Sequence, residues 1–274
     1  MDIILQHKPP LDEIKPYHCG LLKGFCLKGF ENLDILSIPF DNKIKDYNGP
    51  YHLEKRTSSR CTVSFDFTTG GALYHIYAKR YRVRSFAKKL GYMFIPSKCI
   101  KEWRLGLSLL KNGIMTPIPL IAAEHRAGPF VKDNYLVTLG IEPFKSLKPL
   151  LKNMTEKNAI GSILENLAHF MRRAHDVGFY HDDLSLNHIY SHQNPGEERQ
   201  FALIDLDNGR LFRQIPERLV AMNLFQILRC MDESKLPGEE LMRFLESYLQ
   251  NPPSKQLISR INSLSVRKMG RSVI

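Results

Sequence analysis

A chain of 274 residues that is 43% hydrophobic and 24% charged has the composition of a folded globular protein, so a largely disordered chain is excluded. Apolar runs such as residues 118–123 are far shorter than the ~20 residues of a membrane-spanning helix, so an integral membrane protein is excluded as well. The 39 basic and 28 acidic residues leave a net charge of +11, which favours an anionic partner: a nucleotide, a nucleic acid, a phosphorylated glycan or an acidic lipid surface.

The first residues and the cysteines indicate the cellular compartment of the protein. Residues 1–10 lack a basic segment followed by an apolar core, so no signal peptide is predicted and the expected compartment is cytoplasmic. The five cysteines contain no Cys-x-x-Cys pair, which indicates reduced thiols rather than a disulfide framework or a zinc site. An aromatic–basic recognition motif is absent too, and no nucleic-acid partner is expected.

The first third of the chain predicts an extension and then a hairpin. Residues 1–50 carry five prolines and only short apolar clusters, so we expect an irregular N-terminal extension. From Thr62 to Phe67 the side chains alternate with period two, and residues 73–78 are strand-like again. Gly70-Gly71 between them supplies turn chemistry, so the segment predicts a β-hairpin.

The middle of the chain predicts a helix, a strand and a break. Apolar residues recur at three- and four-residue steps between Pro96 and Gly113, which predicts an amphipathic helix that ends near Gly113. Residues 135–139 read as a buried strand. Glu142-Pro143 then suits a connector between two lobes.

The second half predicts mostly helix. Apolar residues spaced from Ile160 to Met171 predict a long helix that ends near Gly178, and short strands are expected at 189–190 and 201–206. From Arg218 onward the pattern is helical. We therefore predict an α+β fold with two lobes, a strand-rich lobe over residues 51–140 and a mainly helical lobe over residues 141–274.

The most specific signal is a loop motif followed by a strand-end acid. It reads His175-x-x-Gly178-x-x-His181-x-Asp183-x-x-x-x-His188, with Asp205 closing the next apolar strand. Phosphoryl transfer uses such a pair, because one carboxylate positions the acceptor hydroxyl and takes its proton while the other binds Mg²⁺. Alternatively, Asp183 forms a turn and Asp205 caps a helix. The combination at fixed offsets favours catalysis.

Upstream, a lysine and a glutamate complete the pattern. Lys79 is placed at the end of the second hairpin strand, and Glu102 is the one acid in a helix rich in basic residues. A strand lysine held by a helix carboxylate can reach the α- and β-phosphates of ATP. The alternative is a surface lysine and a solvated Glu102 paired along its helix with Lys98 or Lys101.

These motifs together resemble the protein-kinase superfamily, and in detail the lipopolysaccharide core kinase family that includes Kdo and heptose kinases. The resemblance spans residues 51–229 and is carried by Lys79-Arg80, Glu102-Trp103-Arg104, Leu109 to Ile114, His188 at the end of the loop motif, and Ile204-Asp205-Leu206. It implies a kinase-like fold, ATP and Mg²⁺ as cofactors, and a core sugar hydroxyl as acceptor.

The resemblance also implies roles for individual residues. Asp183 would be the catalytic acid–base group, Lys79 would contact the ATP phosphates, and Glu102 would hold Lys79. A second group of residues is assigned to ATP or Mg²⁺: Arg56, Ser58, Ser59 and Glu142 to the nucleotide, and Asp205 with His188 or Asn187 to the metal.

The sequence departs from ordinary kinases at several points. No Gly-x-Gly-x-x-Gly precedes Lys79, and residues 55–60 stand where the phosphate-covering loop is expected. Asn223 replaces the aspartate expected to brace the catalytic loop. Asp182 replaces the arginine that reads a phosphorylated activation loop, so regulation by such phosphorylation is not expected.

The predicted acceptor is the lipopolysaccharide core glycolipid, and an anionic inner-membrane surface is a further expected partner, because basic residues cluster after Lys79. Two alternatives stay open: a kinase of the same fold acting on a protein or small molecule, and a non-catalytic kinase-like module that binds through its basic surface.

Overall fold

The computed structural model describes residues 9–40, 50–249 and 255–272. The chain divides into two compact units, residues 1–108 with 117–141 and residues 109–116 with 142–274. The expected N-terminal extension and C-terminal lobe therefore lie partly outside the described residues. Each unit is described by itself.

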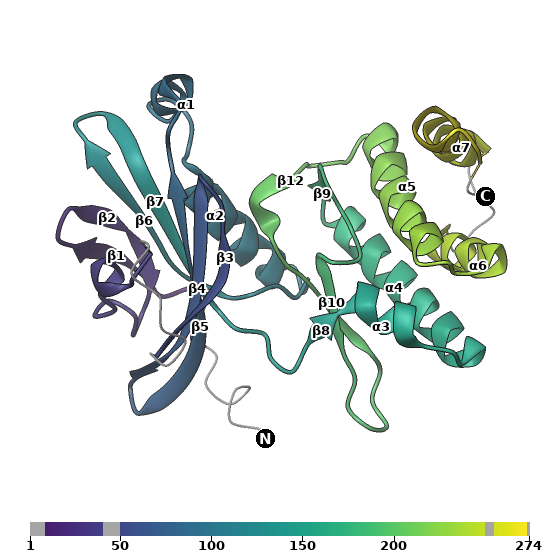
Figure 1. Cartoon of the computed structure of the whole chain (residues 1–274), viewed down its shortest axis with the longest axis horizontal. Helices are drawn as coiled ribbons and strands as arrows, with labels where there is room; N and C mark the ends of the chain where they lie inside the picture. Colours follow the sequence, from purple (N-terminus) through teal and green to yellow (C-terminus); the bar gives the residue numbers. More distant parts are fainter. Residues whose placement is uncertain (1–8, 41–49, 250–254, 273–274) are drawn as a thin grey trace. The chain divides into compact units, whose positions relative to one another are not determined.

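The first unit is built on one antiparallel sheet of seven strands (Figure 1). In spatial order the strands are β1 (Ile14–Cys19), β2 (Leu22–Leu27), β6 (Pro119–Ala127), β7 (Phe130–Leu139), β5 (Ala72–Arg82), β4 (Arg60–Thr69) and β3 (Tyr51–Arg56). One helix, α2 (Lys98–Lys111), supplies the buried charged partner of the sheet. A shorter helix, α1 (Phe86–Gly91), follows the end of β5.

The predicted hairpin forms from β4 and β5, with Gly70 and Gly71 in its turn at φ of +56° and +79°. Both angles lie in the left-handed region that glycine adopts without a steric penalty. The hairpin is longer than predicted, because β5 continues to Arg82 and pairs with β7 up to Asp133. Lys79 therefore lies inside β5 rather than at its end.

The prediction that residues 1–50 are irregular is wrong for the part that the structure describes. β1 and β2 form a hairpin, and β2 pairs with β6, so this segment extends the sheet. Pro16 lies within β1, which is an edge strand with a partner on one side only. A proline is tolerated there because its missing N–H need not face a neighbouring strand.

The predicted amphipathic helix is α2, and its apolar side chains are buried. Trp103 is 5% exposed and stacks on Phe25 of β2, with ring centroids 5.8 Å apart. Gly113 follows the helix at φ +74°, so this prediction is confirmed at both ends.

The second unit is mainly helical, as predicted. Its helices are α3 (Leu147–Asn153), α4 (Lys157–Asp176), α5 (Glu217–Glu233), α6 (Gly238–Leu249) and α7 (Lys255–Met269). α4 packs against α6, and α5 packs against α7. Across the part of the chain that the structure describes, none of the helices combines the length and apolar character needed to cross a bilayer.

Two small sheets in this unit position the loop motif. One holds β11 (Gln200–Leu203), β10 (Ile189–His192) and β8 (Lys145–Ser146), and the other pairs β9 (Phe179–His181) with β12 (Gly209–Leu211). β11 ends at Leu203, earlier than predicted, because Asp205 adopts φ +56° and ψ +55° ahead of the short 3₁₀ turn η2 (Leu206–Asn208). A strand cannot continue through that conformation.

Candidate active site

In the first unit, Lys79 and Glu102 form a buried ion pair. Lys79 Nζ lies 3.4 Å from Glu102 Oε2, and the two side chains are 13% and 3% exposed. Lys79 pairs with Thr62 on β4 and with Leu136 on β7, so the lysine is fixed by strands on both sides. The structure thus brings together the two residues that the sequence predicted to meet across strand and helix.

The second oxygen of Glu102 is also engaged. The Tyr81 hydroxyl donates to Glu102 Oε1 over 2.6 Å, and Lys98 Nζ lies 4.8 Å from the Tyr81 ring centroid. Lys98 therefore contacts the ring, and the alternative of a solvated Glu102 is not supported, because Glu102 is buried. Sequence reasoning missed Tyr81, although its position two residues after Lys79 places it on the same face of β5.

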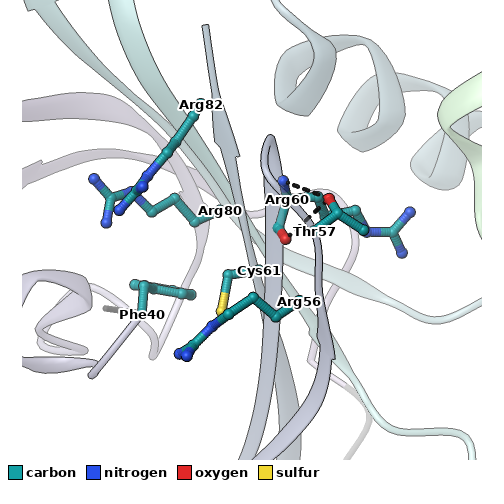
Figure 2. Close-up of a pocket in the computed structure, with 7 residues that line it drawn as sticks. All are labelled: Phe40, Arg56, Thr57, Arg60, Cys61, Arg80 and Arg82. Atoms are coloured by element: carbon teal, nitrogen blue, oxygen red, sulfur yellow. Dashed lines mark hydrogen bonds between the residues drawn. The ribbon is translucent and has the colours of Figure 1, made fainter. Parts of the chain in front are cut away.

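Three arginines converge on the opposite face of the sheet (Figure 2). Arg56, Arg80 and Arg82 line a cavity of about 50 Å³ together with Phe40 and Cys61, and the turn residues Thr57 and Arg60 complete its lining. Arg56 and Arg80 are both register partners of Cys61, whereas Lys79 is the partner of Thr62. Since successive residues of a strand point to opposite faces, Arg56 does not join Lys79.

The turn between β3 and β4 instead places Arg60 on the Lys79 side. Arg60 Nε donates to Thr62 Oγ1 over 3.4 Å, and its guanidinium lies 5.9 Å from the Tyr81 ring centroid. Figure 2 shows this side chain directed away from the other three arginines. Ser58 and Ser59 are exposed at the turn itself. Arg60 and Lys79 point to the same face because Arg60 pairs with Tyr81, two residues after Lys79. This alternation along the strands is the signal that could have identified Arg60.

In the second unit, a histidine links the backbones of the two predicted acids. The Asp183 N–H donates to His181 Nδ1 over 3.2 Å, and His181 Nε2 lies 3.1 Å from the Asp205 carbonyl oxygen. An imidazole that accepts at Nδ1 and donates at Nε2 is neutral. Burial lowers the pKa of His181, which favours this neutral form.

Two amides on α5 hold the backbone of the loop. Asn223 accepts from the His181 N–H over 3.2 Å and donates to the His181 carbonyl over 2.6 Å. Gln226 donates to the Asp182 carbonyl over 2.7 Å and accepts from the Leu184 N–H over 3.3 Å. The support that the sequence left in doubt at Asn223 is therefore present, and Gln226, one helical turn away, shares it.

Two further motif residues, Gly178 and His175, have structural roles. A side chain at Gly178, where φ is +90°, would meet the Phe212 carbonyl oxygen at 1.9 Å, so only glycine fits. His175 Nδ1 lies 2.7 Å from the Tyr248 hydroxyl of α6. Burial lowers the pKa of His175 to about 4, so it is neutral at physiological pH.

Asp205 does not serve as an ordinary helix cap. It precedes η2, yet its side chain makes no capping hydrogen bond, and its left-handed backbone is rare for a residue with a side chain. Such strain is found where the surroundings require a particular side-chain direction. The alternative that Asp205 only caps the following turn is therefore not supported.

Asp182, the residue before Asp183, forms an ion pair across the loop. Its carboxylate lies 2.6 Å from the Arg210 guanidinium on β12, and the two side chains are 42% and 54% exposed. The Asp182 N–H also donates to the Asn208 carbonyl. The segment after Asp205 is thus tied to the loop without a phosphate group.

The sequence matches a protein-family model over residues 52–248, that of the lipopolysaccharide kinase (Kdo/WaaP) family. The chain belongs to this family. It is similar to a solved structure described as WaaP in complex with acyl carrier protein, with a TM-score of 0.56, 16% identity, and coverage of 80% of this chain and 82% of that chain. No curated protein sequence matches it.

The predicted family and kinase-like fold are therefore confirmed, and a lipopolysaccharide kinase is a phosphotransferase. The family match includes Lys79, Glu102, Asp183 and Asp205, and it continues through α5 and α6, beyond the region of resemblance predicted from the sequence. The similar structure, at this identity, establishes the fold alone.

The donors available to a metal ion in this lipopolysaccharide kinase are few. Among the described residues, no cluster of three or more His, Cys, Asp or Glu side chains could hold a metal. Mg²⁺ in kinases needs fewer protein ligands than that, because phosphate oxygens and water molecules complete its octahedral coordination. Asp205 offers a carboxylate, Asn187 is exposed, and His188 Nδ1 is buried with no hydrogen-bond partner. This donor set fits a metal bound mainly through the nucleotide.

Glu142, the remaining predicted nucleotide contact, is exposed and is the first residue of the long segment of the second unit.

Proposed function

We propose that this lipopolysaccharide kinase transfers the γ-phosphoryl group of ATP, with Mg²⁺, to a heptose or Kdo hydroxyl of the inner core. The observation that carries this proposal is the hydrogen-bonded link from Asp183 through His181 to Asp205. It supports a shared role for the two acids, because His181 holds the backbone of Asp183 at a fixed place beside the backbone of Asp205.

In this proposal Asp183 orients the acceptor hydroxyl and accepts its proton as the oxygen attacks phosphorus. Among the described residues no cation pairs with the Asp183 carboxylate, so it is available to accept that proton. Bound Mg²⁺ would supply charge neutralisation at the phosphates. Asp205 would hold it, with His188 or Asn187 as the second protein donor.

The ATP phosphates would be bound by Lys79, oriented by Glu102. Ser58 and Ser59 at the β3–β4 turn would cover them, with Arg60 in place of Arg56 because Arg60 shares the face of Lys79. Glu142 would contact the nucleotide in the connector. The two compact units would then correspond to the two kinase lobes, with β1 and β2 added to the first, and the enzyme would act at the cytoplasmic face of the inner membrane.

The test is a transfer assay with purified protein, γ-labelled ATP and Mg²⁺. The acceptors are core glycolipids truncated so that they end in Kdo or in heptose, alongside a soluble sugar and a generic protein substrate. We expect label in one class of glycolipid only, and none when Mg²⁺ is chelated.

Two results would contradict the proposal. Label in the protein acceptor but in no glycolipid would favour a protein kinase. Binding of the glycolipids without any transfer would favour the non-catalytic module.

A further inference from the structure

Five large apolar side chains cluster in exposed positions on and just after α1. We call this set the apolar knob: Phe86, Leu90, Met93, Phe94 and Ile95, which are 69%, 45%, 41%, 82% and 60% exposed. None of the residues of α1 is buried. Single exposed apolar residues are common on proteins, but a contiguous group usually marks a surface that binds a partner.

Backbone hydrogen bonds and a ring contact hold the apolar knob in place. Backbone hydrogen bonds run from Phe94 N–H and Ile95 N–H to the Gly91 carbonyl, both over 3.0 Å. The Phe86 ring lies 6.2 Å from the Phe130 ring of β7. In Figure 1, α1 stands beyond the end of β5 within the first unit. The apolar side chains are thus presented on an ordered support.

The segment that carries the knob is basic. Residues 82–101 contain six Lys or Arg and no Asp or Glu. Arg84 and Lys88 are exposed beside the knob. Apolar side chains within a basic segment are the combination by which peripheral proteins bind anionic bilayers, since the apolar part enters the interface while the cations meet the phosphates.

The same charge argues against a second copy as the occupant. In a two-fold symmetric contact the same patch meets itself, so the exposed Arg84 and Lys88 of one copy would lie near those of the other. We propose that the apolar knob inserts into the surface of an anionic lipid bilayer and thereby docks the kinase on the membrane. The inference does not depend on which sugar accepts the phosphoryl group, because docking is measured without catalysis.

The experiment is co-sedimentation of the full chain with vesicles. One set is phosphatidylcholine alone and the other is equal parts of phosphatidylcholine and phosphatidylglycerol. The variant Phe94→Ser/Ile95→Ser should weaken binding to the anionic vesicles about a hundredfold, roughly tenfold for each apolar side chain kept out of the interface. Leu21→Ser/Leu73→Ser is the matched control, since these residues are 73% and 59% exposed elsewhere on the first unit, and it should bind like wild type.

A charge variant and a depth probe separate insertion from simple attraction. Lys88→Ala/Lys89→Ala should weaken binding about fivefold per residue, and less as salt rises. The variant Phe94→Trp should show fluorescence that brominated lipids quench, whereas Leu21→Trp should not.

Several outcomes would overturn the inference: no binding of wild type to anionic vesicles, wild-type binding by Phe94→Ser/Ile95→Ser, or equal loss in the matched control. If that variant instead turned a dimer into a monomer while vesicle binding stayed intact, the surface would belong to a second copy. Transfer to a core glycolipid dispersed in detergent, where no bilayer is present, should be unchanged in Phe94→Ser/Ile95→Ser, so a failed docking test is distinguishable from a failed kinase assignment.

Discussion

The two units hold their functional side chains in different ways. Lys79 in the first unit is fixed by charge, through an ion pair with a glutamate that is 3% exposed. Asp183 in the second unit is fixed through its backbone, by His181 and by the neutral amides of Asn223 and Gln226.

The difference fits the role proposed for each group. A lysine that binds phosphate stays charged throughout, so a buried carboxylate beside it maintains both its charge and its position. A carboxylate that accepts a proton would be a poorer base if a cation paired with it, because the pair lowers its pKa. Because the groups that position Asp183 are neutral, they leave its carboxylate able to accept the proton of the acceptor hydroxyl.

The largest effect should come from removing that charge. Asp183→Asn keeps the shape and the backbone hydrogen bonds, but the amide cannot accept the hydroxyl proton, so kcat should fall roughly 10²–10⁴-fold. ATP affinity and the thermal midpoint should change little. The adjacent Asp182→Asn is the control and should stay within a few-fold of wild type. Equal activity of the two variants would remove the role given to Asp183.

The effects of mutating Lys79 and Glu102 should depend on each other. Removing one partner of a buried pair leaves an uncompensated charge, which costs about 3–5 kcal/mol of stability, whereas removing both costs less. Lys79→Met and Glu102→Gln should therefore be strongly non-additive in the free energy of unfolding and in kcat/KM. Single losses that simply add in a double-mutant cycle would show that Glu102 does not act through Lys79.

Local sequence patterns predicted the parts of both sites that are encoded locally. The hairpin, α2 and α4 each bury one face, so their periodicity reveals them, and Lys79 and Glu102 followed from their places on those elements. β6 was missed because residues 119–123 are buried on both faces and show no alternation. β1 was missed because its proline is compatible only with an edge position, which is a property of the assembled sheet.

Contacts that depend on register could not be predicted in the same way. Whether Arg56 or Arg60 shares the face of Lys79 is decided by the three-residue turn between β3 and β4, where a shift of one residue would exchange them. Gln226 and Arg210 reach the Asp183 loop from segments far along the chain, and nothing in the sequence around them indicates that partner.

The neutral brace can be tested at Asn223. Asn223→Ala would leave the buried His181 N–H and carbonyl without partners, at about 1–3 kcal/mol for each group left unsatisfied. The free energy of unfolding and kcat should both fall, while KM for ATP should change little. A loss of stability with unchanged kcat would mean that the amide supports the fold but does not position Asp183.

The variant Asn223→Asp tests whether the side chain at position 223 must be uncharged. The introduced carboxylate could accept from the His181 N–H but would face the His181 carbonyl and Gln226 Oε1, which now accept hydrogen bonds from Asn223. Burial and these oxygens should raise its pKa in the folded state above the ordinary ~4 of the unfolded chain. The loss of stability should therefore be small at acidic pH and grow as pH rises through that interval. Destabilisation that is independent of pH would contradict this reasoning.

The smallest effect should come from the exposed ion pair between Asp182 and Arg210. Because both side chains are about half exposed, breaking the pair with Arg210→Ala should cost less than ~1 kcal/mol. In kinases regulated by an activation-loop phosphate, an arginine at the position of Asp182 binds the phosphate; here the charges are reversed, and the cation is on the segment that follows Asp205.

Because that contact is made by a permanent side chain, activity should not require phosphorylation of the protein. Phosphatase-treated protein should keep full activity, and the swap Asp182→Arg/Arg210→Asp should restore what either single change loses. The single variant Asp182→Arg should lose more than Asp182→Asn, because two cations would then face each other across the loop. Activity that disappears on phosphatase treatment, and returns with a phosphorylating partner, would show that the Asp182–Arg210 pair does not by itself order this segment.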